Sequence, residues 1–317
     1  QGSVVDKAPF PVYSYQEAML LFGTDKPDLR NPLRIFDMTD FFQKCTFRPF
    51  LGKTVRAIRV HAQMSKGFHE KLLQFATGIG MGGLGYLDML EDGTLKGPIE
   101  KFIPDGCREE FSRLAGLKAG DTVFFMADRQ ERAAYYAGMI CTQLGERLGL
   151  LEEHAFRFCY VNDFPMYEKD PETKKPVFTH NPFSMPQGGL LALNTKDPLD
   201  ILACQYDIVC NGVELASGAV RNHDVKTMAK AFEIAGYDEK TLQEKFGALY
   251  EAFQFGAPPH AGMAPGIERM LMLLRGEDNI REVTAYPMNG NAQDLMCGAP
   301  GTVTEQQLRE VHVKIRE

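Results

Sequence analysis

The stretch that decides the fold lies near the C-terminus, where residues 262–274 read Gly-Met-Ala-Pro-Gly-Ile-Glu-Arg-Met-Leu-Met-Leu-Leu. Its two glycines, Gly262 and Gly266, let the backbone approach a ligand without a Cβ in the way. Glu268 and Arg269 then open an apolar helix, whose burial would fix the direction of the guanidinium. Arginine carries a planar fork of donors that suits phosphate oxygens or the face of a base. Taken alone, the stretch is better explained as a buried helix with a surface arginine at its start.

A second polar segment lies upstream, where residues 211–224 read Asn-Gly-Val-Glu-Leu-Ala-Ser-Gly-Ala-Val-Arg-Asn-His-Asp. The pattern predicts a strand, a small-residue turn at 216–218 and a second strand, with Glu214 and Arg221 on either side of the turn. Asp207 lies on the strand that leads in, and alternate strand residues share a face. Two carboxylates from neighbouring segments, Asp207 and Glu214, are suited to hold a divalent cation through oxygen ligands. This clustering favours a site over a solvated strand with a surface ion pair.

Together these segments resemble those of the bacterial-type aspartyl-tRNA synthetases, which are class II aminoacyl-tRNA synthetases. Residues 266–269, Gly-Ile-Glu-Arg, resemble the third motif of that class, usually Gly-Leu-Asp-Arg. Residues 211–224 resemble the aspartate enzyme's own Asn-Gly-x-Glu and Arg-x-His segment. Further similar segments, in order along nearly the whole chain, are residues 23–30, 161–168, 179–184 and 279–283. The third motif indicates only class II, whereas the longer segments are specific to aspartate.

Three parts of such an enzyme have no counterpart in the sequence. These are the first motif, which builds the dimer interface, the second motif, whose arginine grips the α-phosphate, and the N-terminal anticodon-binding barrel. Phe156-Arg157 is the string nearest to the second motif, but no acid follows it. Gln1-Gly2-Ser3 is interpreted as a remnant of an expression vector rather than native sequence. The chain is therefore expected to be a piece of a larger enzyme that begins after the second motif.

Composition is typical of a cytosolic protein, long enough for a large core or two domains. The formal charge of −7 argues against strong nucleic-acid binding by bulk electrostatics and leaves room for a local tRNA contact. The seven cysteines are scattered without metal-ligand spacing, so reduced thiols are expected. No apolar run reaches membrane-spanning length and no signal peptide is visible, so no membrane partner is expected.

The pattern of the sequence divides the chain into four parts. Residues 1–28 are expected to be a segment of the catalytic domain. Residues 29–152 form a self-contained α/β unit, which the resemblance identifies as the insertion domain of bacterial aspartyl enzymes. Residues 153–290 are the class II catalytic core with the third motif, and residues 291–317 a C-terminal extension. Strands followed by helices predict an α+β fold, which the resemblance specifies as part of an antiparallel class II catalytic sheet with helices, plus the inserted α/β domain.

Hydrophobic periodicity predicts the individual elements. Helices are expected at 15–22, 65–77, 129–148, 225–235 and 238–255, and strands at 54–60, 86–90, 121–126, 156–161, 177–179, 203–211 and 214–222. Residues 80–85 superficially match the dinucleotide fingerprint Gly-x-Gly-x-x-Gly. Because this glycine run follows a helix rather than a strand, a tight connection is favoured.

Three histidines stand out. His180 lies in the segment 179–184, which resembles the family's aspartate-site loop; the family more often has two adjacent histidines, and here the second position is Asn181. His223 is expected to orient Arg221. His260 is a candidate for the lining of the nucleotide pocket.

The resemblance implies adenylate-forming ligase chemistry on L-aspartate, ATP and tRNA, with Mg²⁺ as cofactor and a homodimer for the parent enzyme. Arg221 would hold the side-chain carboxylate of aspartate, and His180 would help to close that site. Glu214 with Asp207 would coordinate Mg²⁺ on ATP. The nucleotide pocket would be shaped by Gly266, Ile267, Glu268 and Arg269, and the catalytic residues would be Arg221 and Arg269.

Two alternatives stay open. The first is a non-catalytic, synthetase-like module that binds a small molecule, which the missing second motif favours. The second is a nucleotide-dependent amide ligase on the same fold. Pyrophosphate exchange with each amino acid separates the first alternative from the ligase, and a screen of free amines as acceptors tests the second.

Overall fold

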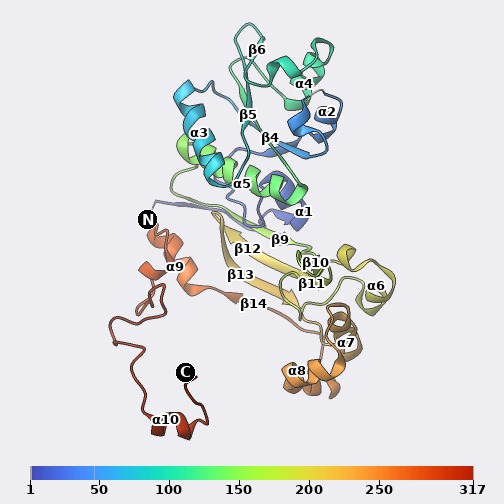
Figure 1. Ribbon diagram of the computed structural model, residues 1–317, viewed down its shortest axis with the longest axis vertical. Coiled ribbons are helices and arrows are strands. Elements are labelled where there is room, and N and C mark those ends of the chain that lie inside the picture. The colour runs from blue at the N-terminus through green and yellow to red at the C-terminus, as the bar shows by residue number, and fades with distance from the viewer. Residues whose placement is uncertain (1, 46, 317) are drawn as a thin grey trace. The chain divides into compact units, whose positions relative to one another are not determined.

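The computed structural model describes residues 2–45 and 47–316 (Figure 1). Gln1, the first residue of the predicted vector remnant, lies outside the described residues. The chain forms two compact units, residues 1–264 and 265–317, and each is described by itself.

The first sheet of the larger unit has five strands in the order β14-β13-β12-β9-β2. These are Ala261–Pro265, Val213–Val220, Gln205–Cys210, Phe158–Asn162 and Val12–Ser14. β12 is antiparallel to both β13 and β9, and β2 is parallel to β9. Helix α1 (Tyr15–Leu21), capped by Ser14 and Glu17, packs Ala18 onto one face of this sheet. The antiparallel sheet predicted from the sequence is confirmed for β9, β12 and β13, and β2 joins it in the parallel direction.

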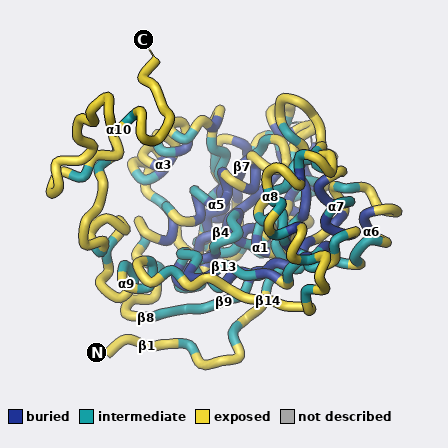
Figure 2. The backbone as a smooth tube through the Cα atoms, turned by 90° about the horizontal axis from the view of Figure 1, so that it is seen from below, coloured by how far each residue is buried: buried dark blue, intermediate teal, exposed yellow. Residues whose placement is uncertain are grey.

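The second sheet of this unit is antiparallel in all four of its strand pairs and has the order β3-β4-β7-β5-β6. Its strands are Ile35–Asp37, Thr54–Val60, Thr122–Asp128, Gly85–Met89 and Leu95–Lys96. The helices around it are α2 (Thr39–Gln43), α3 (Lys66–Gly78), α4 (Arg108–Ala115) and α5 (Gln130–Arg147). Two apolar clusters pack around it, one with residues of α3 and α5 and the other with residues of α2 and α4. Buried backbone is concentrated along β4, β7 and α5 (Figure 2).

The larger unit also contains helices, short strand pairs and 3-10 turns outside the two five-stranded sheets. Helices α6 (Gly189–Thr195), α7 (Val225–Ile234) and α8 (Glu239–Gln254) contact one another in sequence. Short strand pairs form between β10 (Tyr167–Lys169) and β11 (Pro176–Phe178), and between β1 (Val4–Val5) and β8 (Ala155–Phe156). The 3-10 turns are Arg48–Phe50, Glu100–Phe102, Asp105–Cys107, Pro198–Asp200 and, in the smaller unit, Ile280–Glu282.

The smaller unit contains α9 (Ile267–Arg275) and α10 (Glu305–Glu310). Gly266 is the N-cap of α9, and Gly276 ends it in the left-handed conformation that favours glycine. The expectation that the apolar run buries this helix is wrong for the residues described. Ile267 and Leu274 are 68% and 70% exposed, and no residue of the helix is fully buried.

The predicted small-residue turn is also wrong. β13 is continuous from Val213 to Val220, so residues 216–218 lie inside a strand. The turn lies instead at Asn211 and Gly212, which have φ of 51° and 82°. Asn-Gly is the pair that tolerates left-handed φ at both central positions of a tight hairpin. The small residues have a packing reason, since a Cβ on Gly218 would lie 2.5 Å from the ring of Tyr206.

The other expected elements are present within a few residues, with one division. The strand expected at 156–161 is broken at Arg157 into β8 and β9. The Arg157 guanidinium forms ion pairs with Glu152 and Asp6. This arginine, from the string nearest to the second motif, thus binds acidic side chains of its own chain.

Candidate active site

Arg221 lies beside a cavity of about 580 Å³ at the end of β13. The cavity is lined by Asn181, Ser217, Gly218, Arg221, Leu249, Phe253, His260 and residues 261–264. Among these described lining residues none is acidic, so the guanidinium of Arg221 is their one fixed charge. An anionic group of a ligand would therefore meet an uncompensated cation in a partly apolar cavity.

The position of Arg221 is fixed by its backbone and by an aromatic ring. Its N–H donates to the carbonyl of His260 at 2.9 Å, and it forms an antiparallel bridge with Ser184. The guanidinium carbon lies 5.4 Å from the ring centroid of Phe183, within cation–π range. His223 Nδ1 lies 3.2 Å from the Arg221 carbonyl oxygen. The contact of His223 with Arg221 is thus to the backbone of the arginine.

Asp207 and Glu214 lie on neighbouring strands of the first sheet. Asp207 is paired with Ser217, and Glu214 with Val209, across an irregularity in the β12–β13 register. Because Asp207 and Val209 are two apart on one strand, both carboxylates belong to the same sheet face. The structure thus brings these two predicted residues together.

The environment of the pair is charged and partly desolvated. Asp207 is 3% exposed, and burial raises the pKa of its carboxyl, with a further increase from the negative charge of Glu214. Lys26 Nζ lies 2.6 Å from Asp25 Oδ2 and 3.5 Å from Glu214 Oε2. Burial opposes the charged form of Lys26, but these carboxylates outweigh burial and raise the pKa of Lys26.

The pair fits a magnesium ion bound together with phosphate oxygens. The buried Oδ1 of Asp207 has no hydrogen-bond partner among the described atoms, so it retains a free acceptor. Within residues 2–45 and 47–316, no group of three or more His, Cys, Asp or Glu side chains forms a metal site. Mg²⁺ commonly takes only one or two carboxylates and completes its shell with waters and substrate phosphates.

His180 and Asn181 occupy different surroundings. The His180 ring packs edge-on against Phe164, with centroids 5.0 Å apart, and lies 6.4 Å from the ring of Tyr15. Asn181 lines the Arg221 cavity, as does His260. Of the two positions at which the family often has adjacent histidines, residue 181 lines the Arg221 cavity and residue 180 does not.

The third-motif residues belong to the smaller unit. Gly266 precedes α9, and a Cβ on it would lie 3.3 Å from Arg269 Cδ. Glu268 is an exposed residue of the first helical turn. The share of residues 266–269 in an ATP site stays a prediction.

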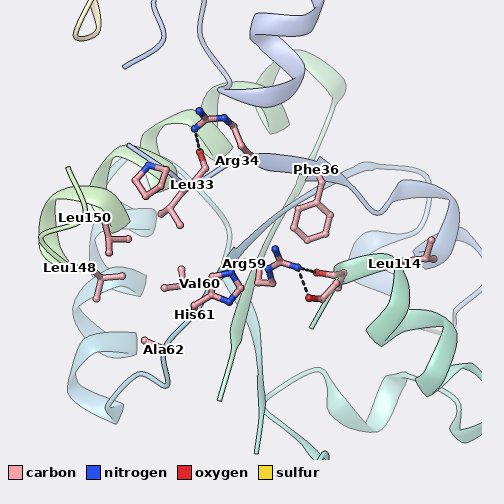
Figure 3. Close-up of a pocket in the computed structure, with 13 residues that line it drawn as sticks. Leu33, Arg34, Phe36, Arg59, Val60, His61, Ala62, Leu114, Leu148 and Leu150 are labelled. Atoms are coloured by element: carbon pink, nitrogen blue, oxygen red, sulfur yellow. Dashed lines mark hydrogen bonds between the residues drawn. The ribbon is translucent and has the colours of Figure 1, made fainter. Parts of the chain in front are cut away.

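Another cavity, of about 500 Å³, lies by the second sheet and contains none of the predicted site residues (Figure 3). Two arginines line it, and both donate to backbone carbonyls: Arg34 Nη1 to those of Asn31 and Leu33, and Arg59 Nη1 to those of Ala115 and Gly116 at the end of α4. Cations at a helix C-terminus stabilise the last carbonyls, so Arg59 has a structural task.

Two neighbours of the site were missed from the sequence, Lys26 and Phe183. Residues 23–30 already stood out as a segment similar to the family, and Lys26 is the cation in it that reaches Glu214. Phe183 follows the His180 segment directly. No local pattern signals its contact with Arg221.

Comparison with known proteins shows the family of the chain. Residues 3–290 match the family model described as tRNA synthetases class II (D, K and N). The chain therefore belongs to this family of class II tRNA synthetases.

Two relatives show which members of the family the chain is similar to. The chain is 51% identical over 312 residues to the aspartate–tRNA ligase of Streptomyces avermitilis, covering 98% of the chain and 53% of that protein. It is 50% identical over 321 residues to the aspartate–tRNA(Asp/Asn) ligase of Zymomonas mobilis, covering 99% of the chain and 54% of that protein. The chain thus spans about half the length of the curated relatives that it matches.

Among solved structures, the aspartyl tRNA synthetase from Entamoeba histolytica is similar at 20% identity, with a TM-score of 0.34. The match covers 77% of this chain and 45% of that one. Two further findings concern the chain itself. All seven cysteines are free, and no described helix is long and apolar enough to cross a membrane.

Proposed function

We propose that the chain carries the aspartate-activating centre of an aspartate–tRNA ligase. The observation that carries this proposal is Arg221, the one fixed charge among the described residues that line its cavity. In the proposed reaction the α-carboxylate of L-aspartate attacks the α-phosphorus of ATP, which gives aspartyl-adenylate and releases pyrophosphate. The aspartyl group then passes to the 3′ end of tRNA, and AMP leaves.

No protein nucleophile is needed, so the residues act by positioning and by charge. Arg221 binds the side-chain carboxylate of aspartate through its planar fork, supported by the ring of Phe183. Asp207 and Glu214 would hold Mg²⁺, which would neutralise charge on the phosphates of ATP. His180 is proposed to help close the aspartate site, and Gly266, Ile267, Glu268 and Arg269 to contact the nucleotide.

Specificity for aspartate over asparagine follows from the same arginine. A guanidinium carries only donors, so it pairs with a carboxylate in a bidentate manner and meets the amide nitrogen of asparagine donor to donor. A site built around such a pair rejects an analogue that leaves its polar groups unpaired.

Several wider features belong to this proposal. The relatives' names cover both tRNA(Asp) ligases and tRNA(Asp/Asn) ligases, and the present proposal is tRNA(Asp), with tRNA(Asn) as a second acceptor to be tested. The full-length protein is proposed to be a cytoplasmic homodimer. Residues 1–28, 29–152, 153–290 and 291–317 are proposed as catalytic segment, insertion domain, catalytic core and C-terminal extension.

The test is aspartate-dependent ATP–pyrophosphate exchange, followed by charging of both tRNAs, in the full-length protein and in the 317-residue chain. We expect both activities in the former and negligible exchange in the latter. The sequence has no segment similar to the second motif, and loss of one transition-state contact typically costs about 10²–10³ in rate. Robust exchange by the 317 residues alone would contradict the expectation that the second motif is needed for activation. Absence of exchange in the full-length protein would refute the ligase.

A second candidate function rests on the same cavity, whose arginine can bind a carboxylate whether or not a reaction follows. In it, the cavity at Arg221 binds a small carboxylate without catalysis. Calorimetric titration of aspartate into the full-length protein, together with a silent exchange assay, would favour that function over the ligase.

A further inference from the structure

The segment that joins α1 to β3, residues 22–34, lies directly against helix α5 of the second sheet. Gly23 has φ of 69°, and a Cβ on it would lie 2.5 Å from the backbone nitrogen of Gly138. In return, a Cβ on Gly138 would lie 2.7 Å from the carbonyl oxygen of Gly23. The two backbones are therefore in contact at a point where only glycine fits on either side.

Further contacts fasten the same segment to the same helix. Asn31 Nδ2 donates to the carbonyl of Cys141 at 3.0 Å. A Cβ on Gly145 would lie 2.8 Å from Asn31 Cγ, so this side chain rests on the bare backbone of the helix. Gly138, Cys141 and Gly145 are three and four residues apart and share one face of α5.

The other side of the segment reaches the carboxylate pair. Lys26 Nζ lies 3.5 Å from Glu214 Oε2. A Cβ on Gly212, in the turn between β12 and β13, would lie 3.5 Å from Asp28 Cβ. A cavity of about 440 Å³ is lined by residues of this segment, of α5 and of the Asn211–Gly212 turn together. The segment thus bridges α5 and the strands that carry Asp207 and Glu214.

We propose that the second sheet and its helices influence ATP binding through the segment 22–34. Helix α5 holds residues 23–31 in place, and Lys26 thereby holds the Glu214 carboxylate in its working position. Lys26 is a positioning residue. Gly138 is the point at which α5 contacts the segment that carries Lys26, and it thereby fixes the position of this lysine. The inference rests on the proposed function, in which Glu214 serves ATP.

The chemistry explains why a tethered cation is useful at this point. Asp207 and Glu214 are like charges on one sheet face, and the former is buried. The two carboxylates repel each other, whereas the ammonium group of Lys26 attracts Glu214 from a segment that is itself held in place. Lys26 therefore orients Glu214 before a ligand arrives, which is preorganisation of the kind that costs nothing during the reaction. The plainer explanation is a half-exposed ion pair between Lys26 and Asp25.

Four variants separate these explanations. Lys26→Met removes the charge and keeps the length of the side chain, and Lys26→Arg restores the charge. Gly138→Ala places a methyl group against the backbone of Gly23, and so displaces the segment without changing Lys26 itself. Gly67→Ala, in the first turn of α3, is the matched control, because a Cβ there meets nothing within 4 Å.

The first readout is independent of activity. Amide hydrogen exchange of residues 24–30 is measured in the 317-residue chain, together with Mn²⁺ binding by electron paramagnetic resonance in the full-length protein with ATP. We expect faster amide exchange in Gly138→Ala and unchanged exchange in Gly67→Ala. Mn²⁺–ATP binding should weaken about tenfold in Lys26→Met, less in Gly138→Ala, and recover in Lys26→Arg.

The second readout is ATP–pyrophosphate exchange in the full-length protein. Lys26→Met should raise the KM for ATP about tenfold at limiting magnesium, with a smaller change in the KM for aspartate. If Lys26 and Gly138 act along one path, the double variant should be no worse than Lys26→Met. That comparison remains informative where Gly138→Ala also lowers the melting temperature.

Glu214→Gln distinguishes a failure of this inference from a failure of the proposed function. If Glu214→Gln behaves as wild type, the role of Glu214 in the proposed function is wrong. If Glu214→Gln disables exchange while Lys26→Met and Gly138→Ala match Gly67→Ala, the function stands and the bridge is refuted. Additive losses in the double variant would also refute a single path.

Discussion

Replacement of Arg221 by lysine tests the core of the proposed function with the smallest chemical change. The guanidinium is the one fixed charge among the described residues that line its cavity, and it faces the ring of Phe183 at 5.4 Å. Lysine keeps the positive charge but loses the planar fork and the stacking surface. The backbone N–H of residue 221 still donates to His260, so the strand end should keep its shape.

The expected magnitude follows from the hydrogen bonds that a guanidinium makes and an ammonium does not. A hydrogen bond to a charged group contributes about 1.5–3 kcal/mol, and the variant is left without one arm of a bidentate pair. A loss of about 2 kcal/mol or more corresponds to roughly a 30-fold lower kcat/KM for aspartate, since about 1.4 kcal/mol is a factor of ten.

The assay is ATP–pyrophosphate exchange in the full-length protein as a function of aspartate concentration. The matched control is Arg113→Lys, an exposed arginine in α4, which should behave as wild type. The KM for ATP should change far less than that for aspartate. Near-wild-type KM and kcat for aspartate in Arg221→Lys would refute the assignment of this residue.

Three further predictions concern packing, pH and the nucleotide. Gly218→Ala should lower the free energy of unfolding by about 1–3 kcal/mol, since its Cβ would lie 2.5 Å from the Tyr206 ring; a urea midpoint equal to that of the glycine control in α3 would contradict this. Burial lowers the pKa of His69 below 6.5, so the unfolded state takes up its proton first as the pH falls. The free energy of unfolding should therefore decline below about pH 6.5, and His69→Phe should flatten this decline in urea titrations; an unchanged slope would show that other groups cause it. Glu214→Gln and Arg269→Lys should each raise the KM for ATP in the full-length protein, and an unchanged KM in either variant would refute the assignment of that residue.

Local sequence patterns were sufficient for most of the elements. Alternation over 54–60 and the apolar period over 129–148 predicted β4 and α5 to within two residues. The glycine run at 80–85 connects α3 to β5, as expected from its place after a helix rather than after a strand. These features depend on neighbours in the chain, which a sequence displays directly.

Features that depend on contacts between distant segments were not predictable in this way. The run Ala216-Ser217-Gly218 indicated a turn, but β13 continues through it because Tyr206 and Gly262 pack closely over Gly218. Burial of α9 was expected from its composition alone, yet burial requires a covering surface, which no periodicity supplies.

The same distinction between local pattern and distant contact applies to the candidate site. The residue types and spacing of Asp207 and Glu214 by themselves made a cation site plausible, because carboxylate pairs have fixed ligand preferences, whereas the role expected of Arg221 came from the resemblance to the family. Only the tertiary structure decided that Asn181 borders the cavity and that Lys26 reaches Glu214. Strand register and the packing of glycine backbones bring such residues together, and both are set by the whole fold rather than by the local chain.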